Sequence, residues 1–192
     1  MAIKKIILCE GVHDLALLSL LLTQMGLRYQ AKDWNEIRKT SKKHAEITVI
    51  DNSLKRDNKI IPFLIKQDEN VNTCIESFWE LYKTGPSNYE LMMVLDADGD
   101  GTRRQLIKMM MDQVKEDVLI QSPDSSNIHC WKKGLQKPAV FIYPGKLTDL
   151  VKDENCGNLS GCRDDAKRRK ILNAYLEMNH AWINELNHFL KV

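Results

Sequence analysis

Short apolar runs alternate along this chain with longer stretches in which apolar residues recur every three or four positions. The short runs have the length of buried strands and cover residues 3–9, 47–50, 89–95 and 139–143. Apolar residues at helical spacing predict helices over residues 15–25, 59–82, 102–118 and 171–190. Alternating strands and helices are typical of an α/β fold, so we expect a mainly parallel sheet of about four strands flanked by helices.

Polar stretches separate these elements. Residues 28–45 are polar and basic, whereas residues 121–137 combine polar and turn-forming residues and are predicted to form a loop. Beyond residue 150 the chain is first charged and then amphipathic, which predicts a terminal helix. We therefore expect an α/β domain over residues 1–150 and a C-terminal helical extension over residues 151–192 that packs on it.

Composition and charge exclude several classes of protein. With 43% apolar residues, the 192-residue chain can bury a core, and its formal net charge of +2 implies no polyanionic partner by itself. No apolar stretch approaches the roughly 20 residues of a membrane span, and the first residues enter the first predicted strand with no room for a signal peptide. We expect a cytoplasmic protein without a membrane partner.

The cysteines indicate neither a disulfide framework nor a regular zinc motif. There are five, an odd number, in a chain with no secretory signal. His129, Cys130, Cys156 and Cys162 are the residues from which a zinc site could be built, but CxxC spacing is absent. A structural role as small buried residues suits Cys9 and Cys74.

Acidic residues follow two of the predicted strands. Glu10 comes after the first strand, and Asp96, Asp98 and Asp100 come after the strand over residues 89–95. Open α/β sheets bind ligands at the carboxyl ends of their strands, so neighbouring strands would bring these carboxylates together. Carboxylate oxygens suit Mg²⁺ or Mn²⁺, which keep positions open for phosphate oxygens. The sequence thus predicts a metal site built from Glu10, Asp96 and Asp98, with Asp100 as a further candidate.

Together the two acidic motifs resemble the TOPRIM domain of topoisomerases, bacterial primases, OLD-family nucleases and small standalone nucleases. The resemblance rests on Glu10-Gly11 with Asp14 and on Asp96-Ala97-Asp98, and it covers residues 3–150. It implies that the two aspartates hold Mg²⁺ and that Glu10 joins the metal site or acts as general acid or base. Gly101 matches a small residue often found after the aspartates. Asp149 stands where OLD-like members usually carry Glu.

The resemblance implies a Mg²⁺-dependent phosphodiester hydrolase acting on nucleic acid, most simply a nuclease. No GxxxxGK[ST] loop is present, so an ATPase of the OLD type would have to be a separate partner. A metal-, nucleic-acid- or protein-binding module without turnover is the alternative. Lys39, Lys42 and Lys43, near Tyr29 and Trp34, are candidates for holding a nucleic-acid strand by charge and stacking, or form a solvated face. The apolar stripe of the terminal helix leaves a homodimer open.

The aspartate cluster also matches other kinds of site. Residues 96–101 match the start of a calcium EF-hand loop, but the position that needs Glu holds Ile107. Haloacid-dehalogenase-like phosphatases carry a similar Asp-x-Asp motif with the first aspartate as nucleophile, which here would be Asp96. Their following Gly-Thr is interrupted by Asp100-Gly101. A solvated loop that leads into a helix capped by Thr102 is the purely structural interpretation.

Overall fold

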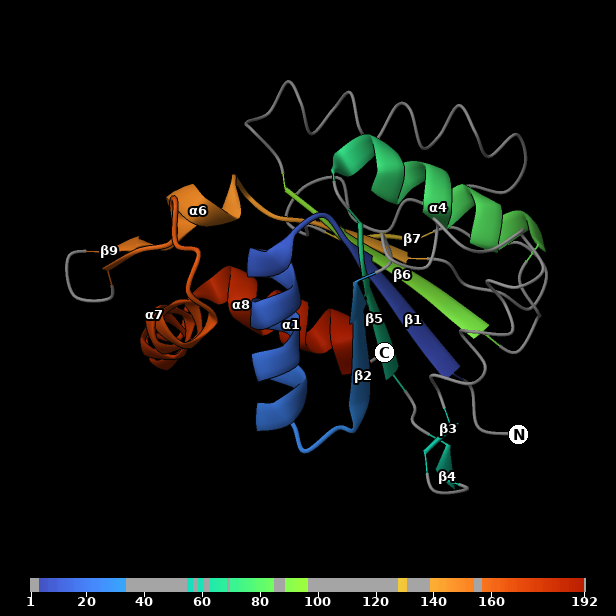
Figure 1. Cartoon of the computed structure of the whole chain (residues 1–192), viewed down its shortest axis with the longest axis horizontal. Coiled ribbons are helices and arrows are strands. Elements are labelled where there is room, and N and C mark those ends of the chain that lie inside the picture. Colours follow the sequence, from blue (N-terminus) through green and yellow to red (C-terminus); the bar gives the residue numbers. More distant parts are fainter. Residues whose placement is uncertain are drawn as a thin grey trace.

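The computed structural model describes residues 4–33, 55–56, 59–60, 63–68, 70–84, 89–96, 128–130, 139–153 and 157–191. Within these ranges the main feature is a six-stranded sheet with strand order β2-β5-β1-β6-β8-β7 (Figure 1). The first five strands are parallel, and β7 runs antiparallel to β8. The predicted α/β fold with a mainly parallel sheet is confirmed, with more strands than expected.

The described elements have the following bounds. The main sheet contains β1 (Lys4–Cys9), β2 (Tyr29–Asp33), β5 (Phe63–Gln67), β6 (Tyr89–Leu95), β7 (Ile128–Cys130) and β8 (Ala139–Ile142). Two small antiparallel pairs are formed by β3 (Lys55–Arg56) with β4 (Lys59–Ile60) and by β9 (Lys152–Asp153) with β10 (Gly157–Asn158). The helices are α1 (Val12–Gln24), α4 (Val71–Thr84), α6 (Leu147–Leu150), α7 (Asp165–Glu177) and α8 (Ala181–Lys191).

Each face of the main sheet carries its own apolar core, because successive side chains of a strand point to opposite faces. Ile7 of β1 and Ile65 of β5 pack in the core that includes α1, α7 and α8. Their neighbours Ile6 and Leu64 pack in the other core, beneath α4. Figure 1 shows the same three layers, with α4 on one side of the strands and the remaining long helices on the other. None of these helices has the length and apolar character that crossing a membrane requires.

The C-terminal helices pack directly on the sheet through aromatic side chains. The rings of Phe141 and Phe189 have centroids 5.6 Å apart, and those of Tyr143 and Trp182 are 5.4 Å apart. The indole Nε1 of Trp182 also donates to the hydroxyl of Tyr175 at 3.2 Å. Residues beyond 150 therefore complete the core on the α1 face of the sheet.

Several predicted elements differ from the structure. The terminal helix is two helices, because the chain turns between them at Asn179, which has a left-handed φ of 53°. Residues 63–67 form β5, not part of a helix. All five are buried in the interior of the sheet, and a short apolar run does not by itself distinguish a buried strand from a helix.

The two outermost strands also lie in stretches without an apolar signal. β2 falls in the polar segment 28–45, and β7 falls in the predicted loop 121–137. Both are edge strands, which need fewer apolar side chains than strands in the interior. The strand predicted over residues 47–50 and the helix predicted over residues 102–118 lie outside the described residues.

Candidate functional site

The topology places the ends of β1 and β6 side by side. The two strands are parallel neighbours, with Cys9 opposite Val94, so the residues that follow both strands emerge at the same edge. The next strand after β1, which is β2, lies on one side of this pair in the sheet, and the next described strands after β6, which are β7 and β8, lie on the other side (Figure 1). Ligand sites of open α/β sheets form at such a reversal of direction, in the crevice beyond the carboxyl ends of the strands.

Glu10 and Asp96 meet at this edge. The backbone N–H of Asp96 donates to Oε1 of Glu10 at 3.0 Å, across 86 residues of sequence. The Oδ1 of Asp96 in turn accepts a hydrogen bond from the backbone N–H of Leu147, also at 3.0 Å. Both carboxylates are therefore oriented by backbone donors, and three separate segments of the chain converge on them. The structure brings together two residues that the sequence predicts as metal ligands.

A third carboxyl group, that of Asp14, lies in the first turn of α1. Its Oδ2 accepts a hydrogen bond from the backbone N–H of Gly11 at 3.0 Å, while its Oδ1 is buried without a partner in the described structure. Burial raises the pKa of Asp14 well above its usual range, and the negative charges of Asp96 and Glu10 raise it further. The bond from Gly11 and an interaction with Tyr143 act in the opposite direction. Negative charge is thus concentrated at this edge of the sheet.

Tyr143 is the neutral neighbour of this carboxyl group. Its side chain is fully buried, and its hydroxyl makes no hydrogen bond of ordinary geometry in the described structure. Burial raises the pKa of Tyr143 well above its usual range, with further contributions from Asp14 and Asp96. The phenol therefore stays protonated at neutral pH, which lets its hydroxyl face a carboxylate as a hydrogen-bond donor.

A buried ion pair beside the site is absent from the sequence predictions. The Nζ of Lys66 lies 3.0 Å and 3.1 Å from the two carboxylate oxygens of Asp68, and neither side chain is exposed. The hydroxyl of Ser77 donates to Oδ1 of Asp68 at 3.3 Å, and the backbone N–H of Asp68 donates to the carbonyl of Cys9 at 2.8 Å. The pair therefore lies next to the end of β1. The signal that could have revealed it is a lysine and an aspartate two residues apart at the end of an apolar run.

Asp149, the remaining described candidate, lies at the surface on α6. It forms an ion pair with Lys152, and the hydrogen bond from this lysine lowers the pKa of Asp149. Its helix is tied to the site through Leu147, but the carboxyl group itself is exposed.

The described residues contain no group of three or more His, Cys, Asp or Glu side chains placed to hold a metal ion. They supply Glu10 and Asp96 as neighbouring carboxylates. The other sequence-predicted candidates lie outside the described residues: Asp98, Asp100, Gly101, Lys39, Lys42 and Lys43. The side chains of His129, Cys130 and Cys156 lie outside them as well.

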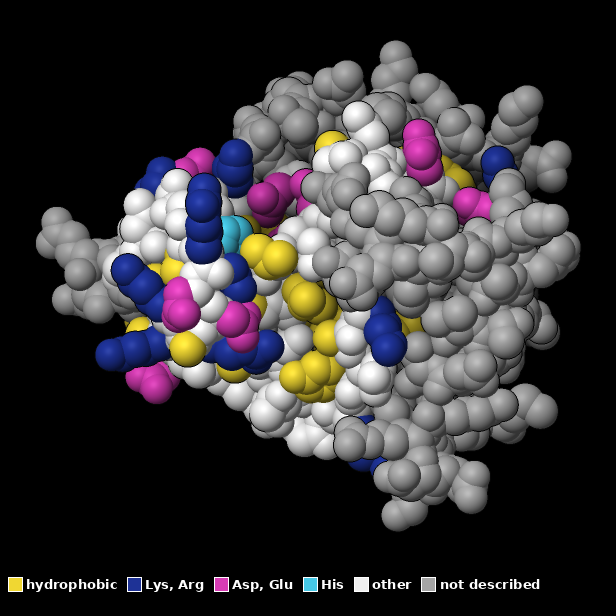
Figure 2. Space-filling model, in the orientation of Figure 1, with side chains coloured by type: hydrophobic (Ala, Val, Ile, Leu, Met, Phe, Trp, Pro, Cys, Tyr) yellow, Lys and Arg dark blue, Asp and Glu magenta, His cyan; other side chains and the backbone are white. Residues whose placement is uncertain are grey.

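The surface near this edge carries both signs of charge. Figure 2 shows Asp and Glu side chains next to the region of α6 and α7, over which Lys and Arg side chains gather. Carboxylates and cations thus lie close to one another on this face. Comparison of the chain with protein-family models, with curated proteins and with solved structures finds no match.

Proposed function

We propose that this chain is a Mg²⁺-dependent phosphodiester hydrolase of the TOPRIM type that acts on nucleic acid, most simply a nuclease. The observation that carries the proposal is the meeting of Glu10 and Asp96 at the adjacent ends of β1 and β6. These residues belong to the two motifs on which the resemblance rests. Their hydrogen bond supports the resemblance without depending on it, because it follows from the topology of the sheet.

The donor set fits a hard divalent cation. Mg²⁺ or Mn²⁺ would be held by Glu10, Asp96 and Asp98, with Asp100 as a further oxygen donor. The pKa of Asp14 is raised first by burial and then by the negative charges of Asp96 and Glu10, and a bound cation would offset those charges. When bound, such an ion offsets the charge of a phosphate group and lowers the pKa of a coordinated water.

The residues of the chain would divide the remaining work. Glu10 would accept the proton of the attacking water or return it to the leaving group, with its carboxylate held in place by the N–H of Asp96. Asp96 would present a carboxylate whose orientation is set by the N–H of Leu147. Two backbone donors thus fix the geometry of the site before any ligand enters.

The test is cleavage of labelled single- and double-stranded DNA and RNA in the presence of Mg²⁺ or Mn²⁺. We expect Glu10→Gln and Asp98→Asn to lower the rate by about 100-fold or more, as for loss of a general acid or base or of a metal ligand. The glutamine can still accept the hydrogen bond of Asp96 through Oε1, so the fold should survive this change. Glu177→Gln, at an exposed position at the end of α7, is the matched control and should cleave like the wild type.

Cleavage that persists in both variants would overturn the assignment of the site. If the wild type cleaves none of the substrates but binds Mn²⁺, the module binds metal without turnover. A covalent phosphate trapped on Asp96 would instead identify a haloacid-dehalogenase-like phosphatase.

A further inference from the structure

Two basic segments are anchored to the carboxyl edge of the sheet by hydrogen bonds. The first is the start of α6, where the exposed Lys146 directly precedes Leu147. Because the N–H of Leu147 donates to Oδ1 of Asp96, the backbone at Lys146 is only one residue away from a direct contact with the site. The backbone of Lys146 therefore lies beside the carboxylate of Asp96.

The second segment is held by Arg168, the buried arginine of α7. Its Nε donates to Nδ1 of His13 at 3.2 Å, and its guanidinium also donates to the carbonyls of Cys162 and Arg163 at 3.1 Å and 3.4 Å. Burial and the charge of Arg168 lower the pKa of His13, so its imidazole is neutral and can accept this bond. Since His13 lies three residues after Glu10, the start of α7 is fixed against the start of α1, beside the site.

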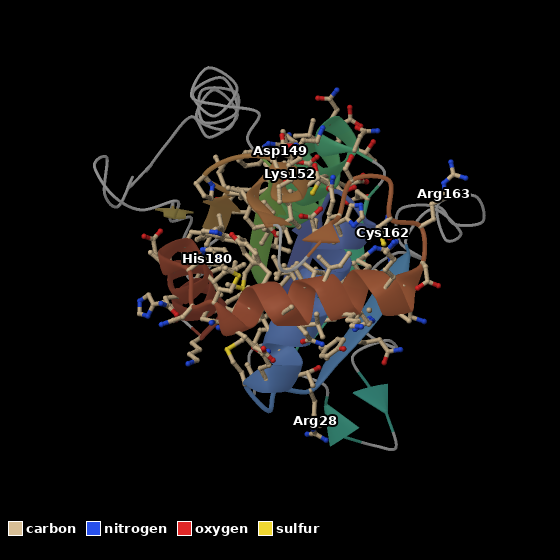
Figure 3. All side chains as sticks on the ribbon, turned by 90° about the vertical axis from the view of Figure 1, so that its left-hand side faces the viewer. Arg28, Asp149, Lys152, Cys162, Arg163 and His180 are labelled. Carbon is tan, nitrogen blue, oxygen red and sulfur yellow. The ribbon has the colours of Figure 1, made fainter. Side chains whose placement is uncertain are left out.

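Lys146, Arg163 and Lys167 are exposed cations of these segments, and none of them forms an ion pair within the described part of the chain. The charge of Lys146 also acts on the nearby Asp149 carboxylate. Other cations nearby have acidic partners: Lys152 pairs with Asp149, and Arg168 and Arg169 share Asp165. In Figure 3, Arg163 lies at one end of α7, with its side chain directed away from the protein, and Lys152 lies above the same helix.

We infer that Lys146, Arg163 and Lys167 form a phosphate-binding rim on which a nucleic-acid strand lies by its backbone, next to Glu10 and Asp96. The choice of nucleic acid among polyanions rests on the proposed function. A cationic surface is needed beside the site, because a pair of carboxylates repels phosphates and cannot by itself hold a polyanion. Two of the three cations belong to the segment beyond residue 150, outside the stretch that resembles TOPRIM, so the rim does not depend on the residues of that resemblance.

A rim that contacts only phosphates should bind without sequence preference and with strong salt dependence. Each phosphate that a lysine or arginine neutralises releases condensed counterions. The slope of log K against log salt therefore changes by about 0.9 per contact for a duplex and about 0.7 for a single strand. The number of cations in the rim can thus be counted from titrations at several salt concentrations.

The test is fluorescence anisotropy with fluorescein-labelled single-stranded and duplex DNA in EDTA, between about 50 and about 200 mM salt. The variant Arg163→Gln/Lys167→Gln should bind about tenfold more weakly and lower the salt slope by about 1 to 2. Lys146→Gln should lower the slope by about 1. The control Lys83→Gln/Lys191→Gln removes the same charge from exposed positions at the ends of α4 and α8, and should bind like the wild type.

The inference is overturned if the control loses as much affinity as the rim variant, if the rim variant keeps wild-type affinity and slope, or if the wild type binds neither probe. Binding to phosphatidylserine vesicles in preference to DNA, lost in the rim variant, would identify a lipid surface and would also overturn it. Because EDTA prevents turnover, the rim and the hydrolase are tested separately. Binding through the rim without cleavage keeps the rim and overturns the hydrolase. If the wild type cleaves nucleic acid and the rim variant binds it with unchanged affinity, the hydrolase is kept and the rim is overturned.

Discussion

The ion pair of Lys66 and Asp68 holds two full charges in the interior of the protein, and replacing the lysine tests how much the fold depends on it. Neither side chain is exposed, and the lysine bonds both carboxylate oxygens at 3.0 Å and 3.1 Å. Lys66→Met keeps a similar length and removes the charge, which leaves the Asp68 carboxylate buried without its cation. Removing one partner of a buried pair costs about 3–5 kcal/mol. A typical domain is stable by only about 5–15 kcal/mol, so this loss is a large part of its stability.

The measurement is urea denaturation at neutral pH, followed by far-UV circular dichroism and by the fluorescence of the four tryptophans. We expect a lower midpoint with an unchanged slope, because the surface exposed on unfolding is the same. The loss should shrink near pH 4 (about the usual pKa of an aspartate), where the carboxyl group can take up a proton. Lys66→Met/Asp68→Asn should recover most of the stability, since it leaves no buried charge.

Two results would refute this reasoning. One is a loss below about 1 kcal/mol in Lys66→Met, which would be the behaviour of a surface pair. The other is a double variant no more stable than the single one, because the defect would then come from packing and not from charge.

Three further substitutions test the rest of the described structure. Asp14→Asn should raise the free energy of unfolding at neutral pH. This gain in stability should vanish at about pH 4. The raised pKa of Asp14 means that the wild type loses stability as the pH rises above the usual carboxyl range, and the amide cannot ionise. Denaturation at several pH values checks this, and a gain independent of pH would contradict it. Tyr143→Phe should change stability by less than about 1 kcal/mol, because the hydroxyl makes no regular hydrogen bond. A much larger loss in the same denaturation assay would show that the bond to Asp14 is strong. Phe78→Ala, at a fully buried position of α4, should cost about 3–5 kcal/mol in thermal or urea unfolding, and a loss below about 1 kcal/mol would show that the α4 core is loosely packed.

The candidate site could be predicted from sequence to the extent that it depends on strand ends. Glu10 and Asp96 each follow an apolar run, and in a parallel sheet the ends of such runs lie at one edge. The apolar runs give no information about the order of the strands in the sheet. That β1 lies beside β6, and not beside β8, is known only from the folded sheet.

In two predicted elements the apolar pattern does not show where a helix begins or ends. β5 was expected to be helical because an apolar run of five residues has no distinctive period when both of its faces are buried. Its two polar residues, Lys66 and Gln67, are not typical of a buried strand, and here the lysine is paired with Asp68 two residues later. The break at Asn179 was missed because the apolar spacing of α7 continues into α8.

The amino-acid sequence by itself determined the class of the fold, because the local pattern of apolar residues decides which segments can be buried and on how many faces. It also determined which carboxylates lie at strand ends, where an α/β sheet opens to ligands. Only the tertiary structure decided that Glu10 bonds to Asp96, that Arg168 fixes the basic start of α7 beside them, and that Lys66 can be buried. The contacts of Glu10 with Asp96 and of Arg168 with His13 join polar groups from segments far apart in the sequence, so no local pattern can reveal them. The partner of Lys66 is Asp68, two residues away, and what the fold decides there is the burial of the pair.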